Sequence, residues 1–578
     1  MGAESSTADL DRQLHASAAT LTRGLSPVSL SLAWADWAWH LALSPGRQME
    51  LAALATQLAQ DNLRVAADPQ ARDEPAGSAD DDPRFRHEAW THWPFNAIRH
   101  AFHNQEAFWR EATQLPGMTA HHAAETAFFA RQWLDMFSPA NFLLTNPVVL
   151  QDAQQSAGAH LVQGALNAWY DLSGQPDPEK RAQAQRFVLG RDLATTPGQV
   201  VLRNALIELI RYAPQTPKVH PEPLLIVPSW IMKYYILDLS PHNSLVRYLV
   251  GQGHTVYMLS WRNPTAQDHD LSMDDYLRLG IFDALRAVGA QHGRTKPVHA
   301  MGYCLGGTLL AIAAAALSRQ GSSDMAQDVP PLQTLTLLAA QTDFSEPGEL
   351  GLFIDESQIG LLDDITRRQG YLSGSQMAGS FQFLHSRELV WTRRMREYLM
   401  GEREPLSDLT AWNADTTRLP ARMHHEYLVA LYLHNALATN TYRVDGRPVA
   451  LSDMRMPIFL VGTERDHISP WRSVYKLHQL CDSPITFVLA AGGHNAGIVS
   501  EPGHAHRYYQ MASRPANGPW VAPEAWPAQA QRHEGSWWPA WHDWLARHSS
   551  APRPAKPLPA KPRLGAAPGR YVMQRYDD

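Results

Sequence analysis

Residues 299–307 read H-A-M-G-Y-C-L-G-G, and this stretch predicts how the chain folds around it. The apolar run at 298–301 is typical of a short buried strand, and Thr308–Leu317 is typical of a helix. Between them, Gly302-Tyr303-Cys304-Leu305-Gly306 has the spacing of a nucleophile elbow, G-x-S-x-G, with sulfur in place of oxygen. The stretch therefore predicts a sharp strand–turn–helix unit that presents the Cys304 thiol.

The elbow also predicts what surrounds the sulfur. A helix N-terminus beside Cys304 favours the thiolate, and the backbone N–H of Leu305 is the expected oxyanion donor. A second donor is expected from the loop 228–232, where Trp230 and Ile231 follow an apolar strand. The alternative is that Cys304 is a small buried core residue, as free cysteines often are.

Short apolar segments alternate with helical ones after about residue 196, which predicts an α/β fold around a parallel sheet. Besides 298–301, strands are expected at 224–227, 254–259, 335–338, 458–461 and 485–489. A helical, aromatic insert at about 343–443 interrupts this alternation, and we interpret it as a cap or lid over the site.

A nucleophile of this kind needs a base, and the base needs a group that orients it. In α/β-hydrolases the acid and then the histidine follow the nucleophile along the chain. Asp466 comes directly after the fifth expected core strand, and His494 comes after the sixth. Both would emerge beside the elbow at the carboxyl edge of the sheet. His467 is the alternative base, and Asp343 is the alternative acid.

These features predict an α/β-hydrolase fold with a helical cap insertion, preceded by a mainly helical N-terminal domain. The helical domain is expected over residues 1–195, with an acidic linker near 67–83. The catalytic domain is expected over 196–550, and a tail rich in proline and basic residues follows over 551–578.

Composition argues against several classes of protein. Of the 578 residues, 44% are apolar and 19% are charged, and the net charge of −7 offers no basic excess for nucleic acid. The two cysteines, Cys304 and Cys481, form no C-x-x-C pair, so no metal site is predicted and Cys481 is interpreted as structural. The N-terminus does not have the pattern of a secretory signal, and no apolar run reaches the roughly 18 residues of a membrane-spanning helix. A reducing cytoplasm fits best.

Matching segments, in order, run from about residue 25 to the C-terminus, and through them the chain resembles the polyhydroxyalkanoate synthases (poly-3-hydroxybutyrate polymerases), class I by length. The segments are SPVSLSLAWADWAWHLALSPG (26–46), FSPANFLLTNPVVL (137–150), FVLGRDLATTPGQVV (187–201), KYYILDLSPHNSLVRYLVGQGHTVYMLSWRNP (233–264), GYCLGG (302–307), DFSEPGELG (343–351), LTAWNADTTRLP (409–420), GTERDHISPW (462–471), GGHNAGI (492–498) and GSWWPAWHDWL (535–545).

The resemblance implies a function and a set of roles. Cys304 would carry the growing chain, His494 would be the base, and Asp466 would be the third member. The substrate would be an (R)-3-hydroxyacyl-CoA, most simply 3-hydroxybutyryl-CoA, with coenzyme A as a product and no separate cofactor. The enzyme would be a cytoplasmic homodimer bound to the growing polyester and to the surface of its granules.

Two segments depart from the family pattern. Residues 228–233 read Pro-Ser-Trp-Ile-Met-Lys where the family usually has Pro-Pro-x-Ile-Asn-Lys. In the cap, His385 stands where the family usually has arginine. We expect His385, Trp412 and His467 to join Trp230 and Ile231 in contacting substrate.

Sulfur suits a polymerase, because thioester exchange keeps the acyl group activated for transfer to an alcohol. The alternatives are a thiol-dependent thioesterase or depolymerase on the same fold, and a weakly active, granule-binding paralogue.

Overall fold

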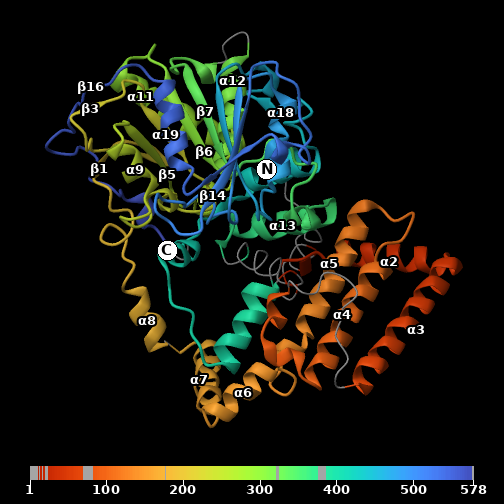
Figure 1. The fold of residues 1–578 in the computed structure, drawn as a ribbon. Helices are drawn as coiled ribbons and strands as arrows, with labels where there is room; N and C mark the ends of the chain where they lie inside the picture. Colours follow the sequence, from red (N-terminus) through yellow and green to blue (C-terminus); the bar gives the residue numbers. More distant parts are fainter. Residues whose placement is uncertain are drawn as a thin grey trace.

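A computed structural model shows a ten-stranded mixed sheet above a group of long helices (Figure 1). The structure describes residues 24–68, 82–175, 177–319, 324–374 and 386–575, and the single positions 11, 14, 15, 17, 19, 22 and 376. Along the sheet the strands are β1 (Gly198–Arg203), β2 (Ile207–Tyr212), β5 (Val256–Trp261), β4 (Leu224–Val227), β6 (Val298–Tyr303), β7 (Leu332–Leu338), β12 (Ile458–Thr463), β13 (Ile485–Ala490), β14 (Tyr508–Arg514) and β15 (Gln531–Glu534).

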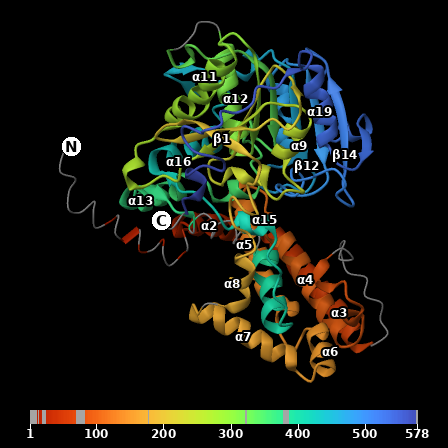
Figure 2. The same cartoon turned by 90° about the vertical axis from the view of Figure 1, so that its left-hand side faces the viewer.

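The six central strands, from β5 to β13, are parallel and correspond to the six strands predicted from sequence. Alternate residues of each strand enter two separate apolar cores. In β4, Leu225 and Val227 lie in the core under α11 (Asp283–His292) and α12 (Leu305–Ser318). Leu224 and Ile226 lie in the other, under α9 (Leu245–Gly251) and α19 (Trp538–Arg547) (Figure 2). Burial on both faces explains the continuous apolar runs.

Helices dominate the described part of the first 190 residues. Two helices meet near residue 45, because Ser26 and Pro27 start the first helix and Pro45 starts the second, as proline at a first turn favours. The helices are α2 (Pro27–Ala42), α3 (Pro45–Ala67), α4 (Phe95–Ala112), α5 (Ala120–Met136), α6 (Pro147–Gln155), α7 (Ala159–Ser173) and α8 (Pro178–Ala184). Most of the predicted acidic linker lies outside the described residues. No helix in the described ranges is both long and apolar enough to cross a bilayer.

The inserted segment between β7 and β12 is helical and reaches down among the N-terminal helices (Figures 1 and 2). Its elements include α13 (Glu356–Gln369), η10 (Arg387–Thr392), η11 (Met395–Leu399), α15 (Asp408–Asn413), α16 (Ala421–Tyr427) and η12 (Leu428–Leu433). Helix α7 packs on η11 so closely that a side chain at Gly164 would overlap the carbonyl group of Tyr398.

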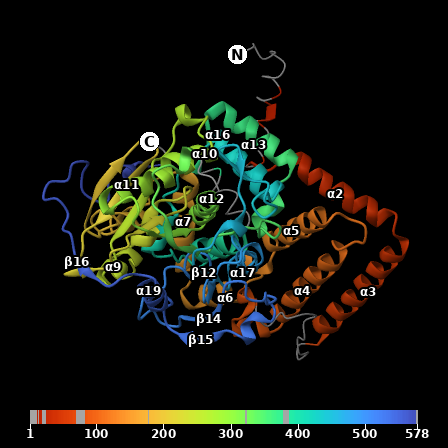
Figure 3. The same ribbon diagram turned by 90° about the horizontal axis from the view of Figure 1, so that it is seen from above.

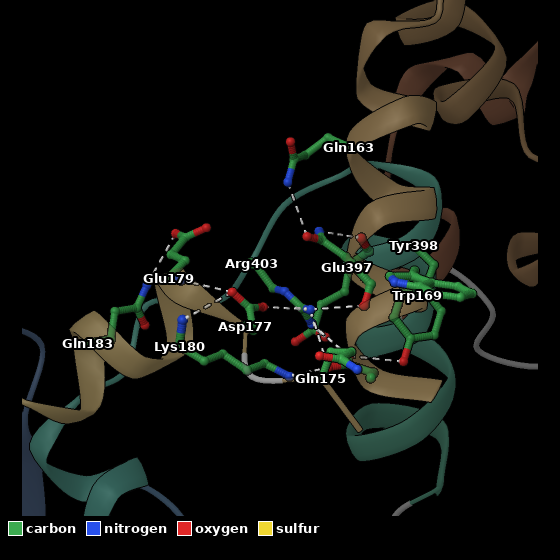
Figure 4. A network of polar contacts seen from close by, with 12 residues as sticks. Gln163, Trp169, Gln175, Asp177, Glu179, Lys180, Gln183, Glu397, Tyr398 and Arg403 are labelled. Atoms are coloured by element: carbon green, nitrogen blue, oxygen red, sulfur yellow. Dashed lines mark hydrogen bonds and ion pairs between the residues drawn. The ribbon is translucent and has the colours of Figure 1, made fainter. Parts of the chain in front are cut away.

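A buried arginine holds this contact together (Figure 4). The Arg403 guanidinium lies 2.7 Å from Asp171, 2.9 Å from Asp177 and 2.6 Å from Glu397, and its side chain is only 4% exposed. Asp171 lies in the last turn of α7, Asp177 caps α8 and Glu397 belongs to η11. One cation therefore joins two N-terminal helices to the cap.

Replacing Arg403 with methionine should remove the cation that all three carboxylates share. Loss of one partner from a buried ion cluster costs about 3–5 kcal/mol, so we expect an early loss of the contact in urea unfolding followed by circular dichroism. Arg181→Met, at an exposed position of α8, is the matched control and should change stability by less than about 0.5 kcal/mol. Equal stability of the Arg403 variant and the control would contradict this role.

The C-terminal stretch is extended, as its composition predicts, and it is also docked on the α/β part. Short strand β16 (Arg553–Pro554) pairs with β3 (Lys218–Val219). Further on, the backbone N–H groups of Arg570 and Tyr571 donate to Glu208, whose side chain is fully buried. Gln574 accepts a hydrogen bond from buried Lys233 through its backbone carbonyl. Proline content does not predict this docking, because backbone groups make most of these contacts.

Candidate active site

The elbow predicted from sequence is present. Strand β6 ends at Tyr303, Cys304 takes φ 53° and ψ −129°, and α12 begins at Leu305. A positive φ at a non-glycine residue is strained, and such strain is typical of functional turns. The turn is tight enough that a side chain on Gly306 would overlap the carbonyl oxygens of Val227 and Pro228.

Gly306→Ala should therefore disrupt the elbow. The added methyl group meets backbone that cannot yield, so we expect a loss of about 3 kcal/mol in unfolding free energy, together with loss of activity. Gly360→Ala in α13 is the control, because nothing lies within 4 Å of the added group and alanine favours a helix by about 1 kcal/mol. Thermal unfolding measures both, and a neutral Gly306→Ala would contradict the tight turn.

His494 and Asp466 meet at the carboxyl edge of the sheet. They follow β13 and β12, which are parallel neighbours in register from Ile458–Ile485 to Thr463–Ala490. The Nδ1 atom of His494 lies 2.8 Å from Oδ2 of Asp466, and both residues are buried. The Asp466 carboxylate also accepts hydrogen bonds from the Thr463 hydroxyl and from the backbone N–H groups of Ile468 and Ser469. These contacts fix the carboxylate and, through it, the imidazole.

His494 also interacts with the sulfur of Cys304. Burial lowers the pKa of His494, but Asp466 and a hydrogen bond with Cys304 outweigh burial and raise the pKa above its usual value. Tyr303, beside Cys304, lies with its ring 5.7 Å from the imidazole ring. The Tyr303 hydroxyl donates to Asn495 at 2.6 Å, which fixes the loop that carries His494. The geometry suits transfer of the thiol proton to His494.

The alternative base, His467, and the alternative acid, Asp343, have other surroundings in the structure. His467 is exposed, and it follows Asp466 directly in the sequence. Asp343 accepts hydrogen bonds from Ser345 and Asn435. The described contacts thus pair His494 with Asp466 and engage Asp343 elsewhere.

The expected oxyanion groups border the elbow. Leu305 is the first residue of α12, so its N–H has no partner within the helix. Trp230 is buried and its ring meets Tyr427 edge-on at 5.7 Å. The carbonyl groups of Trp230 and Ile231 accept hydrogen bonds from the hydroxyl and the N–H of Thr417, so the cap fixes this loop.

Two further residues, Trp412 and His385, were predicted to contact the substrate. Trp412 is buried in the same apolar core as Cys304, and its indole N–H donates to the Lys233 carbonyl at 2.7 Å. Trp412 therefore anchors α15 to the loop after β4. His385 lies outside the described residues.

Sequence reasoning missed two cap tyrosines at the site. The hydroxyl of Tyr427 donates to that of Tyr432 at 3.2 Å. Burial raises the pKa of both hydroxyls, and electrostatic interaction with Cys304 adds to the effect. The ring of Tyr427 also packs against Trp230 of the loop after β4. The helical pattern of 421–433 gives no sign of this placement, because the cap folds back on the elbow from more than 100 residues away.

The sheet, the elbow and the His–Asp pair define an enzyme of the α/β-hydrolase fold, and a family model described as "alpha/beta hydrolase fold" matches residues 222–501. Models described as "Poly-beta-hydroxybutyrate polymerase N terminal" and "Poly-beta-hydroxybutyrate polymerase (PhaC) N-terminus" match residues 5–47 and 81–249.

Curated relatives agree with these matches. The chain is 37% identical over 501 residues to the poly(3-hydroxyalkanoate) polymerase of Methylorubrum extorquens, covering 86% of this chain and 81% of the relative. It is 37% identical over 509 residues to "Poly(3-hydroxyalkanoate) polymerase subunit PhaC" of Cupriavidus necator, covering 86% and 83%. The chain belongs to the poly(3-hydroxyalkanoate) polymerase family and is an acyltransferase.

Proposed function

We propose that the protein polymerises (R)-3-hydroxyacyl-CoA, with 3-hydroxybutyryl-CoA as the preferred substrate, and releases coenzyme A through an acyl group carried on Cys304. The observation that carries the proposal is a cysteine at the elbow, hydrogen-bonded to the buried His494–Asp466 pair, in a chain of this family.

The first half-reaction is thioester exchange. His494 takes the thiol proton, and the sulfur of Cys304 attacks the thioester carbonyl. The backbone N–H of Leu305 stabilises the oxyanion. The bond from the carbonyl carbon to coenzyme A then breaks, and the leaving thiolate takes the proton from His494. One thioester has replaced another at little cost in free energy.

The second half-reaction forms the polymer bond. His494, held by Asp466, takes the proton of a 3-hydroxyl group, and the resulting oxygen attacks the carbonyl carbon of the acyl group on Cys304. The bond from that carbon to the sulfur breaks, and the Cys304 thiolate takes the proton from His494. A thioester is consumed and an oxoester is formed, so the step is downhill. No cofactor is needed, because the activation enters with the coenzyme A thioester.

Water competes with the hydroxyl for the acyl group, so the site must be dry. Cys304 is 8% exposed and lies in an apolar core that also contains Tyr303 and, from the cap, Trp412. The cap is held in turn by the N-terminal helices, since Phe353 packs edge-on against Phe128 at 5.4 Å. This arrangement supports transfer over hydrolysis.

Association with the polyester surface is supported by the N-terminal helices. Of the twenty large apolar residues that are exposed in the described chain, seventeen lie between Leu14 and Val188. They include Trp133 and Phe137, stacked at 5.9 Å and each more than half exposed. We propose that exposed apolar side chains of these helices bind the granule or the second subunit of a homodimer.

The test is an assay of the purified protein with 3-hydroxybutyryl-CoA that follows coenzyme A, free 3-hydroxybutyrate and insoluble polymer together. We expect coenzyme A release to be matched by polymer, with little free acid. Free acid in step with coenzyme A would identify a thioesterase instead. Absence of coenzyme A release would favour a non-catalytic, granule-binding role.

A further inference from the structure

Three potential metal ligands meet where the N-terminal helices join the cap. His121 and Glu125 lie one turn apart on α5, and Asp355 caps the N-terminus of α13. Figure 3 shows these two helices, α5 in orange and α13 in green. His121 Nε2 lies 4.0 Å from Glu125 Oε2 and 4.0 Å from Asp355 Oδ2. One ligand atom from each residue falls within 4.8 Å of the other two.

The ligand atoms of α5 are without hydrogen-bond partners. Glu125 is 2% exposed, and neither its Oε2 nor the Nε2 of His121 has a hydrogen-bond partner in the described part of the chain. A buried carboxylate oxygen without a hydrogen-bond partner destabilises the folded state unless a donor or a cation pairs with it. The Glu125 carboxylate also lies close to that of Asp355, and the two negative charges repel each other.

We propose that His121, Glu125 and Asp355 bind a divalent cation, Zn²⁺ by preference. One imidazole and two carboxylates form a ligand set that zinc accepts, and they neutralise its charge when the imidazole is neutral. Zinc–ligand distances of roughly 2.0–2.2 Å put neighbouring ligands about 3–4 Å apart, so shifts of about half an ångström bring the three atoms to bonding distance.

The surroundings favour this ligand set. The Ser29 hydroxyl donates to Asp355 and lies 3.5 Å from Glu125 Oε1, where it orients both carboxylates.

A second cluster of similar composition consists of Asp82, His103 and Glu106. We do not propose it as a metal site, because an arginine already pairs with both of its carboxylates. The Arg84 guanidinium lies 2.6 Å from Asp82 and 3.0 Å from Glu106. No arginine or lysine ion pair is described at the His121 cluster, where the basic groups are histidines.

A bound ion would join α5 to the first turn of α13, segments about 230 residues apart in sequence. Cross-linking them stabilises the docking of the cap, as ligands that bind only the folded state do. The sequence did not predict this site, because its ligands come from separate segments and show no metal-binding spacing.

The test is Zn²⁺ titration of the full-length, chelator-treated protein by calorimetry, with melting temperature as a second readout. We expect one Zn²⁺ ion to bind tightly to each chain and the melting temperature to rise. Glu125→Gln should weaken this binding at least about 100-fold, and Ser29→Ala about 10–100-fold. Glu125→Gln without zinc should be as stable as the unaltered protein, since it removes a buried charge. His92→Ala, at an exposed histidine of the same region, should bind as the unaltered protein does.

Zinc X-ray absorption of the unaltered protein tests the ligands without any variant and should show a single imidazole with oxygen ligands. Equal zinc affinity in the unaltered protein and in Glu125→Gln would overturn the proposal, as would the absence of binding or a spectrum with several imidazoles.

Discussion

Cys304→Ala should abolish both coenzyme A release and polymer formation, by about 10⁴-fold or more. The variant keeps the sheet and the His494–Asp466 pair, but it has no atom that can take the acyl group. Cys304→Ser should retain acyl transfer at best weakly, because an oxoester is a poorer acyl donor than a thioester. We therefore expect any remaining activity of the serine variant to yield free acid rather than polymer.

Cys481→Ala is the matched control. Cys481 is buried, and burial raises the pKa of its thiol, which disfavours the reactive thiolate. This variant should retain activity, with at most a modest loss of stability. Polymer formation by Cys304→Ala at an undiminished rate would contradict the assignment of the nucleophile.

Asp466→Asn should lower the rate of coenzyme A release by about 10⁴-fold while leaving the fold in place. The amide keeps the size of the carboxylate, but it no longer stabilises the positive charge that His494 gains in each half-reaction. It also presents an N–H group to Nδ1 and favours the wrong imidazole tautomer. The readout is the single-turnover rate with 3-hydroxybutyryl-CoA, which separates chemistry from binding.

Asp343→Asn is the control for this variant, because Asp343 is the other acid that the sequence suggested. Its carboxylate binds Ser345 and Asn435 rather than the imidazole. We expect activity close to that of the unaltered protein. The reverse outcome, an active Asp466→Asn and an inactive Asp343→Asn, would show that the orienting acid was assigned wrongly.

The central sheet and the elbow were predictable because their physical causes are local. Continuous apolar runs such as 224–227 mark strands buried on both faces. Glycine is required at 306 because the backbone at the end of β4 comes too close for a side chain. The order of acid and histidine along the chain then placed Asp466 and His494 at one edge.

The outer strands were not predicted. β1, β14 and β15 are only partly buried, so their apolar residues form no continuous run, and their positions depend on antiparallel pairing with neighbours. The docking of the C-terminal stretch depends largely on backbone hydrogen bonds, which composition does not encode.

The cap shows the same limit of sequence reasoning. Its helical and aromatic character was predictable, but the approach of Tyr427 and Tyr432 to Cys304 and the pairing of Arg403 with Asp171 arise from long-range packing. No spacing within either segment reports such contacts.

The most direct test of the central claim is mass spectrometry of the acyl-enzyme. The protein is mixed with butyryl-CoA, which lacks the 3-hydroxyl group that extends the chain, and is then quenched in acid and digested. The account predicts one butyryl group on the peptide that contains Cys304, removable by hydroxylamine and absent from Cys304→Ala. Release of coenzyme A with Cys304 unmodified, or with the acyl group on another residue, would contradict it.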